Sequence, residues 1–108
     1  MVKKVSMVTD DDFSTKVLNS GSPAVVDFWA TWCEPCLKFD QVLEDVADDY
    51  EGKISFFKVD VNQSNATASK YAVRSIPMLL FFDGGEIVDH AVGTLSRDML
   101  EEKLKKLL

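Results

Sequence analysis

Runs of apolar residues and residues at helical spacing divide the chain into predicted strands and helices. Nearly continuous apolar runs occupy residues 24–30, 54–61 and 78–82, a pattern typical of strands buried on both faces of a sheet. Residues 35–50 carry apolar side chains at helical spacing, with acidic residues such as Asp40 on the remaining positions, so we expect a helix with a solvated outer face there. Residues 2–8 mix apolar and polar positions, which predicts a short edge strand there.

Turn and capping residues complete the pattern. Asp83-Gly84-Gly85 should turn the chain back into an antiparallel strand over 86–92. Three shorter helices are expected. One follows a Thr9 cap, with Asp10, Asp11 and Asp12 in its first turn; another spans about 64–72; the last follows a Ser96 cap, with Leu100, Leu104, Leu107 and Leu108 facing inward. The order βαβαβαββα predicts an α/β fold with a central mixed sheet of about five strands flanked by four helices.

Length and charge narrow the class of protein. The 108 residues suit a single domain over 1–108. A net charge of −6 disfavours nucleic acid and anionic membranes as partners, because both require a basic surface. No apolar run is long enough to span a bilayer, and none follows Lys3-Lys4 as in a signal peptide. We therefore expect a cytoplasmic monomer that binds neither nucleic acid nor membrane.

The two cysteines provide the candidate chemistry. Cys33 and Cys36 lie two residues apart where the predicted helix begins, and Pro35 suits its first turn. A helix N-terminus favours a thiolate, so the pair can act as a redox-active disulfide without another cofactor. Two packed structural thiols, or half of a zinc site, remain alternatives. Because a structural zinc ion takes about four ligands and the chain adds only His90 to the cysteines, no metal site is expected.

Six short motifs spread along the chain carry a more specific signal. They are VVDFWA (25–30), WCEPC (32–36), KVDV (58–61), RSIP (74–77), DGGE (83–86) and VGTLS (92–96). Together they resemble the thioredoxin family over essentially the whole length. The resemblance implies the thioredoxin fold and a dithiol–disulfide oxidoreductase that reduces disulfides in other proteins and is recharged by a thioredoxin reductase.

The same resemblance implies roles for four residues. Cys33 would attack the substrate disulfide, and Cys36 would resolve the mixed disulfide. Asp27 interrupts an apolar run, which is costly unless the carboxylate has a purpose. It would accept the proton of Cys36, with Lys58 on the adjacent strand as its electrostatic partner. A purely structural aspartate, hydrogen-bonded to fix the strand register, is the alternative.

A recognition surface is also implied around Cys33. The family places a cis peptide bond before the proline that corresponds to Pro77. An extended substrate segment could pair with the exposed backbone near Ile76. The residues expected in this surface, besides Pro77, are Trp32, Glu34, Pro35, Ser75, Ile76, Val92 and Gly93.

Three residues depart from the family pattern. Glu34 stands where glycine is usual. At a separation of ~7 Å and an effective dielectric constant of about 40 to 80, it would disfavour a Cys33 thiolate by roughly 0.6–1.2 kcal/mol. We hypothesise that it biases partner choice against acidic surfaces; an exposed glutamate at the helix N-terminus with little effect is the alternative. Gln41 replaces a helix proline, so the usual kink should weaken. Met78 replaces a threonine, which should affect packing more than chemistry.

Two other functions remain open. A disulfide oxidase or isomerase would use the same cysteines with a more oxidising potential. A non-catalytic binding subunit would use the surface without turnover, and would keep its activity after serine replacement of both cysteines.

Overall fold

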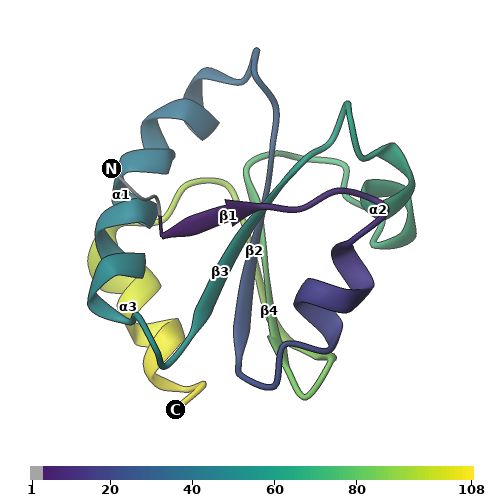
Figure 1. The fold of residues 1–108 in the computed structure, drawn as a ribbon. Coiled ribbons are helices and arrows are strands. Elements are labelled where there is room, and N and C mark those ends of the chain that lie inside the picture. Colours follow the sequence, from purple (N-terminus) through teal and green to yellow (C-terminus); the bar gives the residue numbers. More distant parts are fainter. Residues whose placement is uncertain (1–3) are drawn as a thin grey trace.

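A five-stranded sheet forms the centre of the molecule (Figure 1). The computed structural model describes residues 4–108, so residues 2 and 3 of the predicted edge strand lie outside the described part. The strands are β1 (Val5–Met7), β2 (Ala24–Trp29), β3 (Ser55–Asp60), β4 (Met78–Asp83) and β5 (Glu86–Val92). Their spatial order is β1-β3-β2-β4-β5. Strands β1, β3 and β2 are parallel, β4 is antiparallel to β2, and β5 is antiparallel to β4. The predicted mixed sheet is confirmed.

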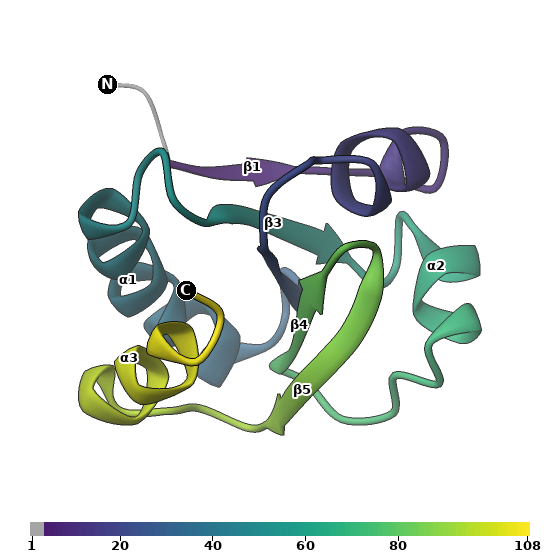
Figure 2. The same cartoon turned by 90° about the horizontal axis from the view of Figure 1, so that it is seen from below.

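Four helical segments cover the two faces of this sheet. They are η1 (Ser14–Leu18), α1 (Glu34–Asp49), α2 (Asn65–Lys70) and α3 (Arg97–Lys105). Figure 2 shows α1 and α3 together on one face and α2, with the purple η1 turn, on the other. The predicted α/β element order is therefore confirmed.

The central strand β2 contributes side chains to both cores. Residues 24–28 are all buried, as the continuous apolar run predicts. Because successive side chains of a strand point to opposite faces, Val25 packs with α1 and α3, whereas Val26 and Phe28 pack on the η1 and α2 side. Asp27 alternates with the latter pair and so points to the α1 side.

The first helical segment differs from the prediction. It is a short π-helix, and Thr9 does not cap it with its hydroxyl oxygen. Instead the carboxylate of Asp12 accepts a hydrogen bond from the Thr9 backbone N–H (2.7 Å). Asp10 leaves this segment altogether and accepts hydrogen bonds at the start of α2, from the backbone N–H (2.8 Å) and hydroxyl (2.6 Å) of Thr67. The first N–H groups of α2 have no partner within the helix and attract a negative charge, and Asp10 binds two of them.

The last helix confirms most of its prediction. The hydroxyl of Ser96 accepts a hydrogen bond from the Met99 backbone N–H (3.2 Å), as expected of a cap. Leu100 and Leu104 are buried in the core. Leu108, however, is exposed, because α3 ends at Lys105 before the last leucine can turn inward.

Candidate active site

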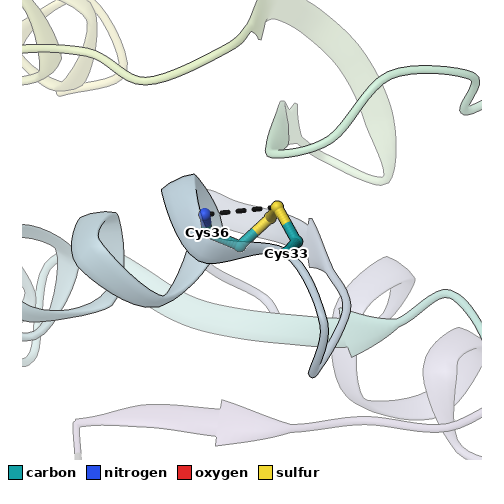
Figure 3. Close-up of a disulfide and its surroundings, with 2 residues drawn as sticks. All are labelled: Cys33 and Cys36. Atoms are coloured by element: carbon teal, nitrogen blue, oxygen red, sulfur yellow. Dashed lines mark hydrogen bonds between the residues drawn. A yellow bond between two sulfur atoms is a disulfide. The ribbon is translucent and has the colours of Figure 1, made fainter.

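The two cysteines form a disulfide where β2 leads into α1 (Figure 3). Their Cα atoms lie 5.3 Å apart. Cys33 is the N-cap residue of α1, and its Sγ accepts a hydrogen bond from the backbone N–H of Cys36 (3.3 Å). Pro35 lies in the first turn, and the helix continues without interruption past Gln41. The sulfurs are therefore held at a helix N-terminus, the position expected from the sequence.

The disulfide is nearly covered by its surroundings. Cys33 is 5% exposed and Cys36 is 2% exposed, so Cys33 is the more accessible, as expected. Ala30 completes a small buried cluster with them, and Ile76 packs against it. A reacting partner therefore meets only a small exposed part of Cys33.

The predicted recognition residues come together from two separate parts of the chain. The Ile76-Pro77 bond is cis, as expected. Gly93 donates its backbone N–H to the Pro77 carbonyl (2.8 Å), and Val92 pairs with Met78 across β4 and β5. These contacts place the segments 75–77 and 92–93 beside each other.

The same surface is apolar and open to solvent. Trp32 is 69% exposed and Val92 is 58% exposed. Glu34, Pro35 and Ser75 are also exposed. Among the described residues, the backbone N–H and C=O of Ile76 take part in no hydrogen bond, which leaves them free to pair with another chain.

Asp27 is buried beside this site without a direct partner. It is 1% exposed, and within the described part of the chain its Oδ1 forms no hydrogen bond. Burial, helped by the charge of Asp40 and opposed by that of Lys58, raises the pKa of Asp27 to about 7. A carboxyl group in this range can take up and release a proton near neutral pH. The missing hydrogen bond also counts against a carboxylate that only fixes the strand register.

Lys58 lies next to Asp27 on β3, but its ammonium group binds elsewhere. The Nζ atom is 3.0 Å from Asp40 Oδ1 and 4.8 Å from the centre of the Trp29 ring. Lys58 thus acts on Asp27 through its charge while its ion pair is with Asp40. The expectation that Asp40 belongs to the solvated face of the helix was wrong. The position of Asp40, four residues after Cys36 on one helix face, was a signal for its inward direction.

A groove of about 470 Å³ lies along the start of α1 and was not predicted. Residues of α1 and of the loop before α3 line it: Glu34, Pro35, Lys38, Phe39, Val42, Thr94 and Leu95. Within this lining the Glu34 carboxylate lies 3.8 Å from the Lys38 ammonium, and the two side chains are 80% and 78% exposed. No pattern in the sequence indicated that Thr94 and Leu95 lie beside α1.

The described residues carry no further sign of a site of another class. No group of three or more histidine, cysteine, aspartate or glutamate side chains is arranged there to hold a metal ion. Nor does any described helix combine the length and the apolar character that crossing a bilayer requires.

Comparison with known proteins gives matches along almost the whole chain. A family model described as Thioredoxin matches residues 4–106. "Thioredoxin 2" of Chlorobaculum tepidum is 44% identical over 96% of this chain and 95% of its own length. "Thioredoxin" of Staphylococcus epidermidis is 48% identical over 94% of this chain and 95% of its own length. "Thioredoxin M4, chloroplastic" of Arabidopsis thaliana is 37% identical over 97% of this chain and 54% of its own length.

Proposed function

The chain belongs to the thioredoxin family and is a thiol-disulfide oxidoreductase; from this premise we propose that it is a reductase of protein disulfides. The observation that carries the proposal is the Cys33–Cys36 pair at the N-terminus of α1, beside an exposed apolar surface. Strong oxidants stabilise their reduced form. Glu34 next to Cys33 places negative charge near the thiolate, which favours a reducing pair instead.

The reaction proceeds in two exchanges. The Cys33 thiolate attacks one sulfur of the substrate disulfide, so that a Cys33–substrate disulfide forms and the first substrate thiolate leaves. The Cys36 thiolate then attacks Cys33 Sγ, which closes the Cys33–Cys36 disulfide and releases the second substrate thiolate. Two electrons pass to the substrate, and the described structure corresponds to the oxidised product.

Asp27 takes the proton of Cys36 in the second exchange. Its pKa of about 7 suits a base that works near neutral pH. The charge of Lys58 tempers this basicity. Replacement of Asp27 by asparagine is expected to slow resolution of the mixed disulfide, whereas formation of that disulfide at Cys33 continues. An unchanged resolution rate would count against the proton role.

An extended segment of the substrate protein binds beside Cys33. The free backbone groups of Ile76 suit pairing with such a segment. Trp32 and Val92 supply apolar contact, and Pro77 and Gly93 shape the surface between them. Pro35 and Ser75 complete its rim, while Glu34 adds charge at one side.

The partners follow from the same reaction. We expect a thioredoxin reductase to recharge the dithiol, disulfide-containing proteins to be the substrates, and the chain to act as a monomer without an added cofactor or metal. The bacterial relatives favour the cytoplasm, and the plant relative is named as chloroplastic. We propose the cytoplasm as the site of action.

The decisive test is the redox equilibrium of the cysteine pair. The protein is equilibrated in buffers of defined dithiol-to-disulfide ratio while tryptophan fluorescence is recorded, because Trp29 and Trp32 lie beside the pair. We expect a potential more negative than about −220 mV, within the reducing range of cytosolic glutathione. A distinctly more oxidising value would favour disulfide formation or isomerisation.

Cysteine variants test the order of the two exchanges. With a protein that carries one accessible disulfide, Cys36→Ser should accumulate a mixed disulfide through Cys33, and Cys33→Ser should not. A chain with both replacements should lose turnover completely. If the doubly substituted chain keeps its activity, the protein is a binding subunit and not a reductase.

A further inference from the structure

Three ionisable side chains meet beneath α1, and they form only one ion pair. Asp27 and Lys58 are register partners on β2 and β3, so their Cα atoms lie side by side. Val25 and Phe56, two residues before them, pack against α1. Because side chains on a strand alternate in direction, Asp27 and Lys58 point to the same helix.

The Lys58 ammonium nevertheless lies away from its register partner. It contacts Asp40 Oδ1 at 3.0 Å and lies over the Trp29 ring at 4.8 Å. The side chain of Lys58 is 9% exposed, so its ammonium lies in a largely dry environment where an ion pair directs it strongly. Asp27 is left with an unbonded carboxylate oxygen.

Asp40 holds this ammonium from the same helix that carries the resolving cysteine. Cys36 and Asp40 are four residues apart in α1 and therefore lie on one helix face. Asp40 is 28% exposed in its side chain, so it forms the outer end of a chain of polar groups that begins at Asp27.

We propose, on the premise that Asp27 takes the proton of Cys36, that Asp40 is a positioning residue for this step. Its ion pair holds the Lys58 ammonium away from the Asp27 carboxylate and so keeps Asp27 available as the base. No other residue assigned to the reaction performs this task.

The charges that surround Asp27 agree with this arrangement. Lys58 from β3 and Asp40 from α1 are the charged groups acting on it, and they act in opposite directions. The neighbour from β4 is the apolar Leu79, and Phe28, the next residue on β2, points to the other face. Removal of Asp40 would both delete one negative charge and free the ammonium to approach Asp27.

The first experiment titrates Asp27 in an Asp40→Asn variant, which keeps the shape of the side chain. Carbon-13 NMR of the carboxyl group is followed from pH 4 to pH 10 in the oxidised and the reduced protein. The pKa of Asp27 is expected to fall by about 1 or more, as for a carboxylate that gains a close cation. Asp48→Asn, which removes the same charge about two turns further along α1, is the matched control and should leave it unchanged.

A double-variant cycle separates the position of Lys58 from the simple loss of charge. In a Lys58→Met background, Asp40→Asn should lower the pKa of Asp27 by less than half as much as in the wild-type background. An equal fall in both backgrounds would mean that Asp40 acts by its own charge alone, which would overturn the proposal. No change in either background would overturn it as well.

The rate of resolution provides the second readout. The mixed disulfide of Cys33 with a coloured aromatic thiol is prepared, and release of that thiol by Cys36 is followed across the same pH range. In Asp40→Asn the pH midpoint should move with the titration of Asp27. Suppose that the wild-type rate changes with pH as Asp27 titrates, but that Asp40→Asn shifts neither the titration of Asp27 nor the pH midpoint of the rate. The positioning role alone then fails. If the wild-type rate does not follow Asp27 at all, the proposed proton step fails and the positioning role fails with it.

Discussion

Each face of the sheet is covered by a buried core, but the two cores differ in the side chains that they contain. On the η1 and α2 side, aliphatic side chains surround a group of aromatic rings: the ring centroids of Phe13, Tyr71 and Phe82 lie between 5.5 and 6.1 Å apart. On the α1 and α3 side, aliphatic and aromatic side chains pack in the same way around Leu43. Only that side, which α1 and α3 cover in Figure 2, also buries two charged side chains of the central strands, Asp27 and Lys58.

The difference shows that the buried charges are not a requirement of the fold. The opposite face of β2 fills the equivalent depth with Val26 and Phe28, which need no polar partner. Asp27 costs stability at neutral pH because burial disfavours its charged form. This cost falls on the face that α1 covers, and β2 carries the buried acid in the strand that leads to the cysteine pair. The α1 face therefore combines a core with a reaction site, and the other face is a core alone.

Truncation of one phenylalanine on each face tests whether the two cores are equally packed. Phe81 is buried on the α1 side and Phe82 on the η1 side, at neighbouring positions of β4. We expect Phe81→Ala and Phe82→Ala each to lower the free energy of unfolding by about 3–5 kcal/mol, through lost contact and a residual cavity. Urea unfolding of the oxidised protein measures both. A cost under about 1 kcal/mol for either would show that its face is loosely packed.

Removal of the buried acid should have the opposite effect on stability. The pKa of Asp27 rises from 3.8 to about 7 on folding. The folded state therefore binds more protons between these values, and stability falls as pH rises from 3.8 to 7. The full shift corresponds to roughly 4 kcal/mol. We expect Asp27→Asn to stabilise the oxidised protein by about 2–4 kcal/mol at pH 8 and by little at pH 4.

The pH dependence distinguishes this explanation from a change in packing. Urea midpoints of wild-type and Asp27→Asn protein are compared at several values between pH 4 and pH 8. A gain that is the same at every pH would mean that the charge of Asp27 is not responsible. Asp83→Asn, which alters an exposed carboxylate at the far end of β4, is the control and should show no gain.

Much of this architecture could be predicted from short-range pattern. Strand β2 and helix α1 follow from an unbroken apolar run and from helical spacing, because both patterns are decided by residues close in sequence. The WCEPC motif and Pro77 locate the candidate site through family resemblance. The roles of individual residues, those of the two cysteines included, still depend on that resemblance and on the proposed chemistry.

Two of the wrong assignments concern side chains whose partners are distant in sequence. Asp10 binds Thr67, 57 positions away, and Asp40 binds Lys58, 18 positions away. Local propensity assigned each carboxylate to its own helix, as a first-turn residue or a solvated side chain. Tertiary structure supplied a stronger partner in both cases: the free N–H groups of α2 for Asp10 and a buried ammonium for Asp40.

Asp10, at the start of α2 on the other face of the sheet, should change stability with pH in the direction opposite to Asp27. Hydrogen bonds from the hydroxyl and the backbone N–H of Thr67 lower the pKa of Asp10. Its contribution to stability is therefore present above pH 3.8 and is lost as the pH falls below that value. Asp10→Asn should destabilise the protein at pH 7, by less than Asp27→Asn stabilises it, and should have little effect near pH 2. Urea midpoints at both pH values provide the measurement, with Asp11→Asn as control. A loss of equal size at pH 2 would contradict a charge-dependent cap.

Glu34 carries the smallest expected effect, because its charge is not buried at all. Its side chain is 80% exposed and lies near Lys38, so water, salt and the neighbouring ammonium all weaken its field. We expect Glu34→Gln to speed reduction of acidic partner proteins by less than about 3-fold at physiological salt, and to leave neutral partners unchanged. Glu34→Gly should give the same ratio if the charge, and not the backbone, is responsible. Rates against a panel of oxidised partners of different net charge, at low and high salt, give the answer, with Glu102→Gln on α3 as the matched loss of charge. Relative rates that stay the same across the panel would remove Glu34 from partner selection and leave it an exposed residue in the first turn of α1.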